Sequence, residues 1–437
     1  MKTGMICLAA GALCGIAYAG TSVGPDVIVG DVSDMSNYGG VGGIHAYSLG
    51  TVSCNVGNEV VDWIDGTNRH PVIGQTIYRL LDGRLEQMGQ SWLKHGFAAL
   101  NGSLCGSCQS TGFDSLGIGC SDPYGSGLNG QQSNLGTKTE VNAYTGLFLW
   151  PFGGSGTGGN AIFKRIQVKD TDLNQAGQWF GGAQYVTLDD AQAGNQNNNS
   201  SWRPLTHNGF TLNVTSFTRR EQAPIYAWKE MDPQVDLQQV FVPGEGMFNL
   251  ATRVYDNGDG TWRYEYALHN QTSDRSADSF SVPAVGVDLT NIGFHDVDYH
   301  SGDPYDLTDW SDAQGGGAIT WSAADAGTNT NALRWGTMYN FWFTANTPPT
   351  TGDVTIHLFK AGTPASITAT TVVPSTGQAG CNVADIAAPF GVLDLADVQA
   401  FIAGFVGGDL IADMNGDNIL DLADVQLFIS NFVAGCP

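Results

Sequence analysis

Short runs of alternating apolar and polar residues, separated by turn residues, fill the chain from residue 20 to about residue 372. Segments 77–81 and 84–88 flank Asp82-Gly83, a dipeptide that favours the type I′ turn of a two-residue hairpin. Segments 251–255 and 261–267 flank a longer, Gly-containing turn of the same kind. Both pairs therefore predict antiparallel β-hairpins.

A third pair of period-two segments lies at 339–343 and 354–358, with Pro348-Pro349 and Gly352 between them. Short strands joined by turn residues predict a large β-sandwich or jelly-roll body, built as one or two units. The polar run 195–201 is the best candidate for a break between two units, and a surface loop explains this run equally well.

The composition agrees with a mainly β body. Gly supplies 59 of the 437 residues and the hydrophobic content is 42%, while Lys and Glu are few. The 42 acidic residues outnumber the 18 basic residues, which form no cluster. The charge pattern therefore argues against nucleic acid or an anionic membrane as a partner.

The N-terminus predicts export. A charged start, an apolar run over residues 5–16 and the Ala17-Tyr18-Ala19 cleavage pattern indicate a signal peptide over residues 1–19. No later segment is long and apolar enough to suggest a membrane span. The expected location is therefore extracellular or at the cell surface.

Six cysteines remain after that cleavage, and an even number in an oxidising compartment predicts disulfides. Cys381 and Cys436 stand apart and should pair, closing a loop worth about 3–4 kcal/mol in the loop-entropy model. A zinc or redox site in the other group would need reduced thiolates, so disulfides are the favoured interpretation. That group allows three connectivities, which the sequence does not rank: Cys54, Cys105, Cys108 and Cys120.

Three further groups in the body carry reactive side chains. Asp296, Asp298 and His300 would share one face of a strand and could bind a metal, although a solvated acidic loop is the favoured interpretation. A second group places histidines beside aromatic residues, an arrangement that is more often packed than catalytic: His70, Trp92, Lys94 and His95. A glycosidase needs two facing carboxylates, and the sequence does not show which candidates meet: Glu86, Glu140, Glu230, Glu245 and Glu265.

The last 57 residues, 381–437, differ from the body because they carry one motif twice. Residues 393–405 and 420–432 are identical at ten of thirteen positions. In the second copy Val425, Phe428, Ile429 and Phe432 fall on one helical face, and the first copy repeats this pattern 27 residues earlier. We expect two helices that bury these stripes against each other.

Residues 413–424 have the spacing of a calcium loop. Calcium prefers six to eight oxygen ligands, which a twelve-residue loop supplies from fixed positions. Asn418 at position 6 tolerates a left-handed backbone, and the side chain of Ile419 is free to pack inward. The expected ligands are five side chains and, at position 7, a backbone carbonyl: Asp413, Asn415, Asp417, Asp421, Asp424 and Ile419.

These duplicated loop-helix units, with Asp at position 12, resemble a dockerin. The ending Gly435-Cys436-Pro437 is similar to the GC-type dockerin of secreted planctomycete proteins, and the body is similar to uncharacterised secreted proteins of those bacteria. The resemblance covers 57 of 437 residues. It implies a small all-α domain at 381–437, a linker at 373–380, a body at 20–372, and docking to a cohesin-like or other surface receptor.

The first copy departs from the dockerin pattern. Asp385 could serve as position 1 only with a one-residue insertion, so we expect one calcium ion, held by the second copy. Asp394 and Asp397 remain suited to cap the first helix. Counted back from position 12, positions 1, 3 and 5 lack side-chain oxygens: Ile386, Ala388 and Phe390.

In dockerins the residues just before position 12 help to select the partner. The matching pairs are the same in both copies, Leu395-Ala396 and Leu422-Ala423, which predicts an apolar, symmetric docking patch. We therefore expect an exported body, of unidentified activity, that a calcium-dependent tail attaches to a cell-surface or extracellular assembly. The alternatives are a polysaccharide-active hydrolase or a glycan-binding module with these aromatic candidates: Trp179, Trp202, Trp262 and Trp310.

Overall fold

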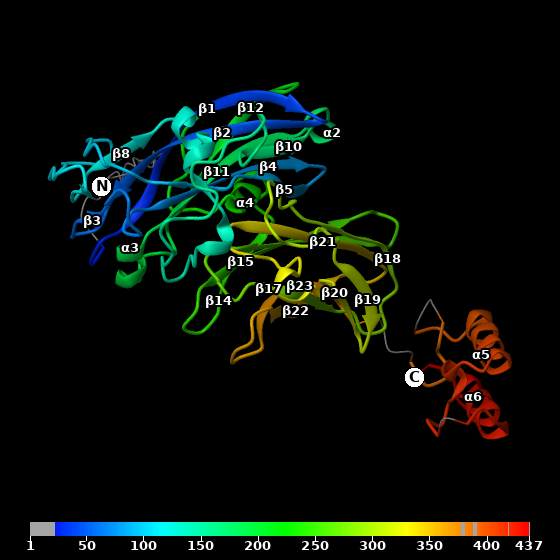
Figure 1. Ribbon diagram of the computed structural model, residues 1–437. Coiled ribbons are helices and arrows are strands. Elements are labelled where there is room, and N and C mark those ends of the chain that lie inside the picture. Colours follow the sequence, from blue (N-terminus) through cyan, green and yellow to red (C-terminus); the bar gives the residue numbers. More distant parts are fainter. Residues whose placement is uncertain (1–21, 377–380, 388–390, 418, 437) are drawn as a thin grey trace, which may run out of the picture.

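A computed structural model describes residues 22–376, 381–387, 391–417 and 419–436. The expected signal peptide, half of the expected linker, Ala388, Phe390 and Asn418 lie outside the described residues. Residues 22–376 form four main antiparallel β-sheets, and helices α5 (Leu395–Gly407) and α6 (Leu422–Ala434) follow near the C-terminus (Figure 1). Among the described residues, no helix is both long and apolar enough to cross a membrane.

The first two sheets come from the N-terminal half. The first has the order β1-β2-β10, with β8 also paired to β2: β1 (Val27–Val41), β2 (Ile44–Asn55), β10 (Ile166–Lys169) and β8 (Ser121–Tyr124). The second has the order β13-β12-β11-β4-β6-β9, with β5 also paired to β4: β13 (Thr211–Val214), β12 (Ser200–Asn208), β11 (Gln178–Val186), β4 (Val72–Leu81), β6 (Leu93–His95), β9 (Leu135–Gly136) and β5 (Arg84–Gln90). A small ladder joins β3 (Val61–Asp62) to β7 (Ser115–Leu116).

The other two sheets follow residue 235. The third has the order β14-β15-β16-β21-β18: β14 (Asp236–Phe241), β15 (Met247–Asp256), β16 (Trp262–Asn270), β21 (Thr337–Ala345) and β18 (Leu289–His295). The fourth has the order β19-β20-β17-β22-β23: β19 (Ser311–Gly315), β20 (Ala318–Ser322), β17 (Ala277–Pro283), β22 (Pro349–Leu358) and β23 (Ser366–Pro374).

The four sheets lie in layers, and each gap between layers is filled by an apolar core (Figure 1). Strand β4 shows how one sequence serves two cores. Its alternate residues Ile73 and Ile77 pack toward the first sheet, whereas Tyr78 packs toward the third. The body therefore consists of two sandwiches, and a third core joins them back to back.

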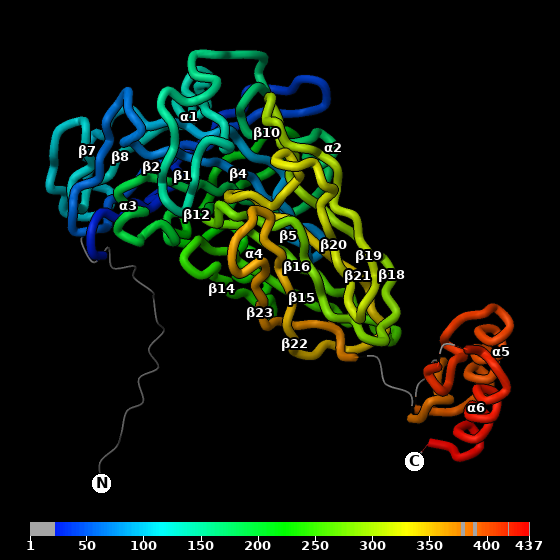
Figure 2. Tube along the Cα trace, turned by 60° about the horizontal axis from the view of Figure 1, so that its bottom comes forward, coloured from blue at the N-terminus to red at the C-terminus, as the bar shows by residue number. Residues whose placement is uncertain are grey.

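Short helices connect the strands. The α-helices are α1 (Ser126–Asn129), α2 (Asp170–Leu173), α3 (Leu188–Ala193) and α4 (Tyr226–Met231). The 3-10 helices are η1 (Gln132–Asn134), η2 (Lys138–Glu140), η3 (Gly327–Asn329) and, between α5 and α6, η4 (Leu410–Ala412). Helices α5 and α6 lie side by side in both views (Figures 1 and 2).

Both predicted hairpins are confirmed. Strands β4 and β5 pair from Leu81 to Arg84, and the turn residues Asp82 and Gly83 have φ values of 51° and 82°, as a type I′ turn requires. Strands β15 and β16 also form a hairpin. The third pair is different, because β21 belongs to the third sheet and β22 to the fourth.

The polar run 195–201 does not separate the two sandwiches. It leads from α3 into β12, which pairs with β11 inside the second sheet. The change from one sandwich to the other occurs later, between β13 and β14. The run is therefore a loop of the first sandwich.

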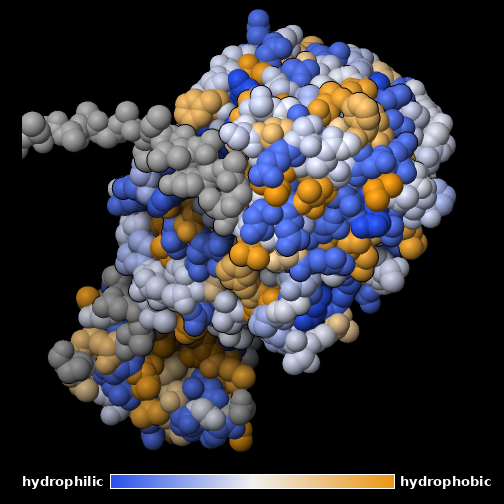
Figure 3. Space-filling model, turned by 90° about the vertical axis from the view of Figure 1, so that its left-hand side faces the viewer, coloured by the Kyte–Doolittle hydropathy of each residue, from blue (hydrophilic) through white to orange (hydrophobic). Residues whose placement is uncertain are grey.

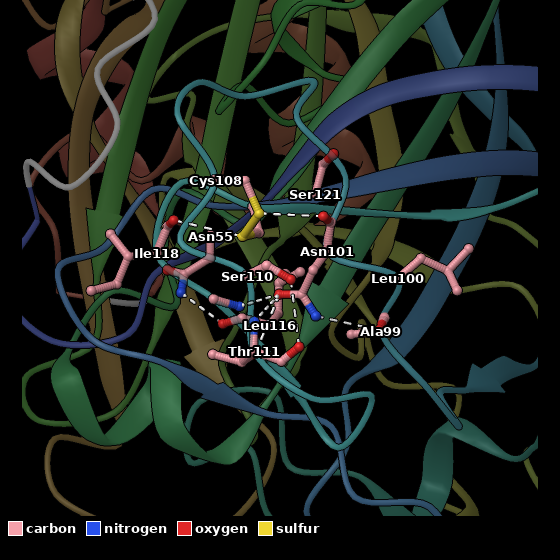
Figure 4. Close-up of a disulfide and its surroundings, with 12 residues drawn as sticks. Asn55, Ala99, Leu100, Asn101, Cys108, Ser110, Thr111, Leu116, Ile118 and Ser121 are labelled. Carbon is pink, nitrogen blue, oxygen red and sulfur yellow. Dashed lines mark hydrogen bonds between the residues drawn. A yellow bond between two sulfur atoms is a disulfide. The ribbon is translucent and has the colours of Figure 1, made fainter.

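All six described cysteines are paired. Cys54 bonds Cys105 and Cys108 bonds Cys120, while Cys381 pairs with Cys436, as predicted. Figure 4 shows Cys108 close to Asn101, whose amide holds the stapled loop. The Asn101 side chain accepts from the backbone N–H of Gly117 at 2.8 Å and donates to the Ser115 carbonyl at 3.0 Å. This network fixes a loop that has little regular structure of its own.

Candidate functional site: the C-terminal loop and helix pair

The core between α5 and α6 is small and aromatic. The rings of Phe401 and Phe428 stack with their centroids 4.2 Å apart, and both side chains are buried. Half-buried neighbours complete the core from matching positions of the two helices: Val398, Phe405, Val425 and Phe432. The prediction that Ile402 and Ile429 belong to this stripe is wrong, because they are 55% and 54% exposed.

Both helices begin with the same set of hydrogen bonds. Asp394 caps α5 and Asp421 caps α6, each in a capping box with the aspartate three residues later. Asp424 accepts from the backbone N–H groups of Met414, Asn415 and Asp421. Asp397 accepts in the same way, from the N–H groups of Ile386, Ala387 and Asp394.

This match aligns the two loops. Ile386 takes the place of Met414, so Asp385 takes the place of Asp413 and the first loop has the one-residue insertion. Asp385 is 4% exposed, and one carboxylate oxygen accepts from the N–H groups of Cys381 and Gly391. Ala387 corresponds to Asn415 and offers no side-chain oxygen, so the first loop still lacks a ligand at position 3.

In the second loop, carboxylate oxygens draw the backbone into a compact turn. One oxygen of Asp413 accepts from the N–H groups of Gly416 and Asp417, at 2.8 and 3.2 Å. The Asp417 carboxylate accepts from the Asn415 amide at 3.0 Å and from the N–H of Ile419 at 2.8 Å. Three expected ligand side chains therefore lie next to one another.

Two details of this loop bear on the expected ligands. The expectation that Ile419 packs inward is wrong, because its side chain is 61% exposed and Leu420 packs against the core instead. The N–H of Asp421, followed by those of Asn415 and Met414, lowers the pKa of the Asp424 carboxyl. Asp424 is thus held ionised at neutral pH.

The charge of this segment is one-sided. Residues 381–437 contain eight Asp and no Lys, Arg, His or Glu. Like charges close together destabilise a compact fold unless a cation compensates them. The second loop carries four carboxylates, one amide oxygen and one backbone carbonyl, a donor set that fits a hard divalent cation.

An apolar surface runs along the outer faces of both helices. Leu395 and Leu422, predicted for docking, are 68% and 67% exposed, and Ala396 and Ala423 adjoin them. The surface continues in matched pairs along each helix: Ile402 with Ile429 and Val406 with Val433. Positions i, i+7 and i+11 share one helical face, so each helix carries one exposed apolar stripe. Figure 3 shows apolar surface gathered on the lower lobe of the molecule.

Two of the three candidate groups in the body, the acidic segment at 296–300 and the glutamates, form structural contacts. The segment after β18 is not a strand, and Asp296, Asp298 and His300 bond separately to Asn331, Lys169 and the Gln90 carbonyl. Among the described residues, the one cluster of three His, Cys, Asp or Glu ligand atoms that all lie within 4.8 Å of one another joins Asp385 to the disulfide of Cys381 and Cys436. Its sulfurs are already bonded to each other.

The glycosidase candidates do not converge on a cavity. Glu86 and Glu265 both bond Arg84. The other three bind separate partners: Glu140 the Gly153 N–H, Glu230 the Arg219 guanidinium and Glu245 the Ser273 hydroxyl. The aromatic candidates of the glycan-binding alternative do not form an exposed row, because Trp262 is half-buried and the other three are buried: Trp179, Trp202 and Trp310.

A cavity of about 890 Å³ lies where the two sandwiches meet. The Arg334 guanidinium covers the Tyr305 ring at 3.4 Å, and Lys138 lies at the wall. Burial lowers the pKa of Lys138 to about 8, while its amine donates to the Gln90 side chain at 2.7 Å. Sequence reasoning missed this cavity, since segments far apart in the chain line it.

No family model and no curated protein matches the chain. Solved structures with some similarity include a serine-rich repeat adhesion glycoprotein from Streptococcus agalactiae, at 10% identity over 82% of this chain and 97% of that one, with a TM-score of 0.19. An exo-chitosanase from Amycolatopsis orientalis is 12% identical over 75% of this chain and 25% of that one, with a TM-score of 0.17. At such TM-scores neither similarity carries an argument.

Proposed function

We propose that the chain is an exported protein whose C-terminal segment attaches the β-body to a cell-surface or extracellular assembly, in a calcium-dependent way. The observation that carries this proposal is the pair of matched apolar stripes on α5 and α6, exposed to solvent at every paired position. Large exposed apolar patches mark interaction sites in soluble proteins. The repeated helix caps support the same view, because they hold both stripes in equivalent settings.

One calcium ion in residues 413–424 would hold the docking surface in shape. Asp413, Asn415, Asp417, Asp421, Asp424 and the carbonyl of Ile419 would be its ligands. When bound, calcium supplies positive charge to a segment that has no basic residue of its own. The disulfide between Cys381 and Cys436 closes the same segment at its ends.

A dockerin-like attachment would need a cohesin-like or other surface receptor as its partner. The two stripes are nearly identical, so a receptor surface with apolar pockets would fit either helix. The aspartates around the stripes favour a receptor rim with Lys or Arg. The body would be the displayed part.

The test is retention of the full chain on isolated cell envelopes of the bacterium that produces it. We expect the protein to sediment with the envelopes in calcium and to be released by EDTA. The double variant Leu395→Asp, Leu422→Asp should lose at least about tenfold in affinity, because each charge would be desolvated in the interface.

The matched control is Val285→Asp with Leu307→Asp, which changes two side chains of the body that are 53% and 55% exposed. This control should be retained like the unchanged protein. Retention of the Leu395, Leu422 variant at full affinity would contradict docking through the stripes. Retention in EDTA would contradict the calcium dependence.

A further inference from the structure

A second cavity in the body, of about 320 Å³, lies beside strand β6. Its size is at the lower end of the range for small-ligand sites. Aromatic side chains, two carboxamides and one carboxylate form most of its wall: Asp65, His95, Phe97, Gln131, Asn134, Trp150 and Phe152. This mixture suits a ligand that has both apolar faces and polar groups.

Trp150 and Phe97 provide the exposed apolar part of the wall. Each is 37% exposed, although a large aromatic side chain is normally buried where packing permits. Phe152 stacks on the imidazole of His95 with centroids 3.7 Å apart, and Trp150 meets the Phe152 ring edge-on at 5.3 Å. Trp150 is therefore held by its neighbours while part of its ring stays open.

The polar groups of the wall have unused hydrogen-bonding capacity. The Asn134 side-chain amide donates to the Gln131 side-chain oxygen Oε1 at 3.3 Å, and Asp65 accepts from the N–H of Gly66 at 2.8 Å. Within the described part of the chain, no group bonds the Gln131 amide nitrogen, the Asn134 oxygen or the second Asp65 oxygen. The free groups are thus one donor and two acceptors.

The charge of the wall argues against ionic ligands. Asp65 is its one formal charge, which disfavours anions. The Lys94 ammonium behind the wall is fully buried, donates to the His95 carbonyl and lies 4.8 Å from the centre of the Phe97 ring. Because that ring already interacts with a cation, a second cation against it would be repelled.

The histidine pair behind the wall adds no charge. The Ile64 carbonyl can only accept, so Nδ1 of His70 carries the proton, and Nε2 of His70 accepts from Nδ1 of His95 at 2.9 Å. Nε2 of His95 then keeps a lone pair, and no described residue donates to it. Burial lowers the pKa of His70 to about 4 and that of His95 to about 2, so both rings stay neutral.

We propose that this cavity binds a neutral saccharide unit. The sugar ring lies against Trp150 and Phe97, and its hydroxyls bond Asp65, Gln131 and Asn134. Hydroxyls both donate and accept, which matches the free groups, while the C–H face of a pyranose matches the rings. An apolar ligand would leave the three polar groups desolvated and unpaired, at a cost in affinity.

The test is isothermal titration of the full chain, in calcium, with cellobiose, lactose, mannobiose and diacetylchitobiose up to about 10 mM. At least one saccharide should bind. Trp150→Ala should weaken that binding at least about tenfold and Trp150→Phe by less, since a smaller ring remains. Asn134→Ala, which removes a polar contact at a half-buried position, should also weaken it.

Phe241→Ala is the matched control, because Phe241 is 56% exposed and lies on β14, in the other sandwich. This control should bind like the unchanged protein. Failure of all four saccharides to bind would overturn the proposal, as would unchanged binding by both Trp150→Ala and Asn134→Ala. Tetramethylammonium or glucuronate binding at the same residues, more tightly than any neutral saccharide, would also overturn it.

Discussion

Helix-capping aspartates in the C-terminal segment contrast with a buried aspartate in the body. Asp394 and Asp421 cap helices and accept backbone N–H bonds near the surface. Asp190 is fully buried in the body, and burial raises its pKa to about 7, although the N–H of Val27 and the Asn199 amide both donate to it. The sequence predicted the Asp394 cap, whereas Asp421 was expected as a calcium ligand. The burial of Asp190 depends on distant strands and left no local pattern.

The raised pKa of Asp190 makes stability depend on pH. The folded state keeps this proton up to about pH 7, whereas the unfolded carboxyl loses it near pH 4, so stability falls as pH rises through this window. An amide cannot ionise, so the variant Asp190→Asn does not lose stability in this way as pH rises. The variant should therefore gain stability relative to the unchanged protein between pH 4.5 and 7.5, by on the order of a few kcal/mol.

Urea unfolding at four pH values across this window measures the difference between the two proteins. The absolute stability of Asp190→Asn can be lower, because an amide accepts only one of the two present bonds. The exposed control Asp312→Asn should show no such change with pH. A difference between Asp190→Asn and the unchanged protein that stays constant with pH would contradict the buried, protonated carboxyl.

The position of a strand is easier to predict from the sequence than the strand with which it pairs. Asp82-Gly83 fixed both the turn and the pairing of β4 with β5, because a two-residue turn leaves one register. Strands β21 and β22 have equally clear alternation, yet they belong to different sheets. Their connection is short, and alternation alone does not state which sheet edge each strand joins.

The turn glycines allow a controlled test of this hairpin. Gly83 and Gly258 both have positive φ, at 82° and 75°. A Cβ on Gly258 would meet nothing within 4 Å, whereas one on Gly83 would lie 2.4 Å from the Tyr255 hydroxyl. Gly258→Ala should cost about 1 kcal/mol from backbone strain alone, and Gly83→Ala about 2–3 kcal/mol.

The free energies of unfolding from urea titrations compare the two variants directly. Tyr255 donates to the Gly83 carbonyl at 2.9 Å, so moving its ring aside would also cost that bond. Tyr255→Phe with Gly83→Ala should recover part of the loss. Equal costs for Gly83→Ala and Gly258→Ala would contradict the close approach of Tyr255.

At the scale of the whole molecule, the sequence predicted the division into two parts but not the way in which the sheets pack. The division into a mainly β body and a C-terminal repeat was visible as a change from period two to helical spacing, and the acidic loop was visible because its candidate ligands lie within twelve residues. The layering of four sheets and both cavities were not visible. Residues from distant segments build them, and no spacing along the chain records those contacts.

The body and the C-terminal segment should unfold in separate steps, because their cores share no residues. The core around Phe401 and Phe428 contains only residues 384–432, and the three cores between the sheets contain only residues 27–373. In our proposal calcium binds only the folded loop. Calcium should therefore raise the midpoint temperature of the smaller calorimetric transition, that of the C-terminal segment, and leave the larger transition of the body unchanged.

Arg84→Ala should instead destabilise the body and leave the C-terminal segment unchanged. Arg84 bonds both oxygens of Glu265, which is fully buried in the junction between the sandwiches, and the variant leaves that carboxylate with Arg263 at 3.3 Å as its partner. Removing one member of a buried pair costs about 3–5 kcal/mol. The midpoint temperature of the larger transition should therefore fall, while that of the smaller transition should not change.

Scanning calorimetry with calcium and with EDTA measures both transitions in one sample. A single transition that responds to both calcium and Arg84→Ala would contradict two independent cores and require the C-terminal segment to fold as part of the body.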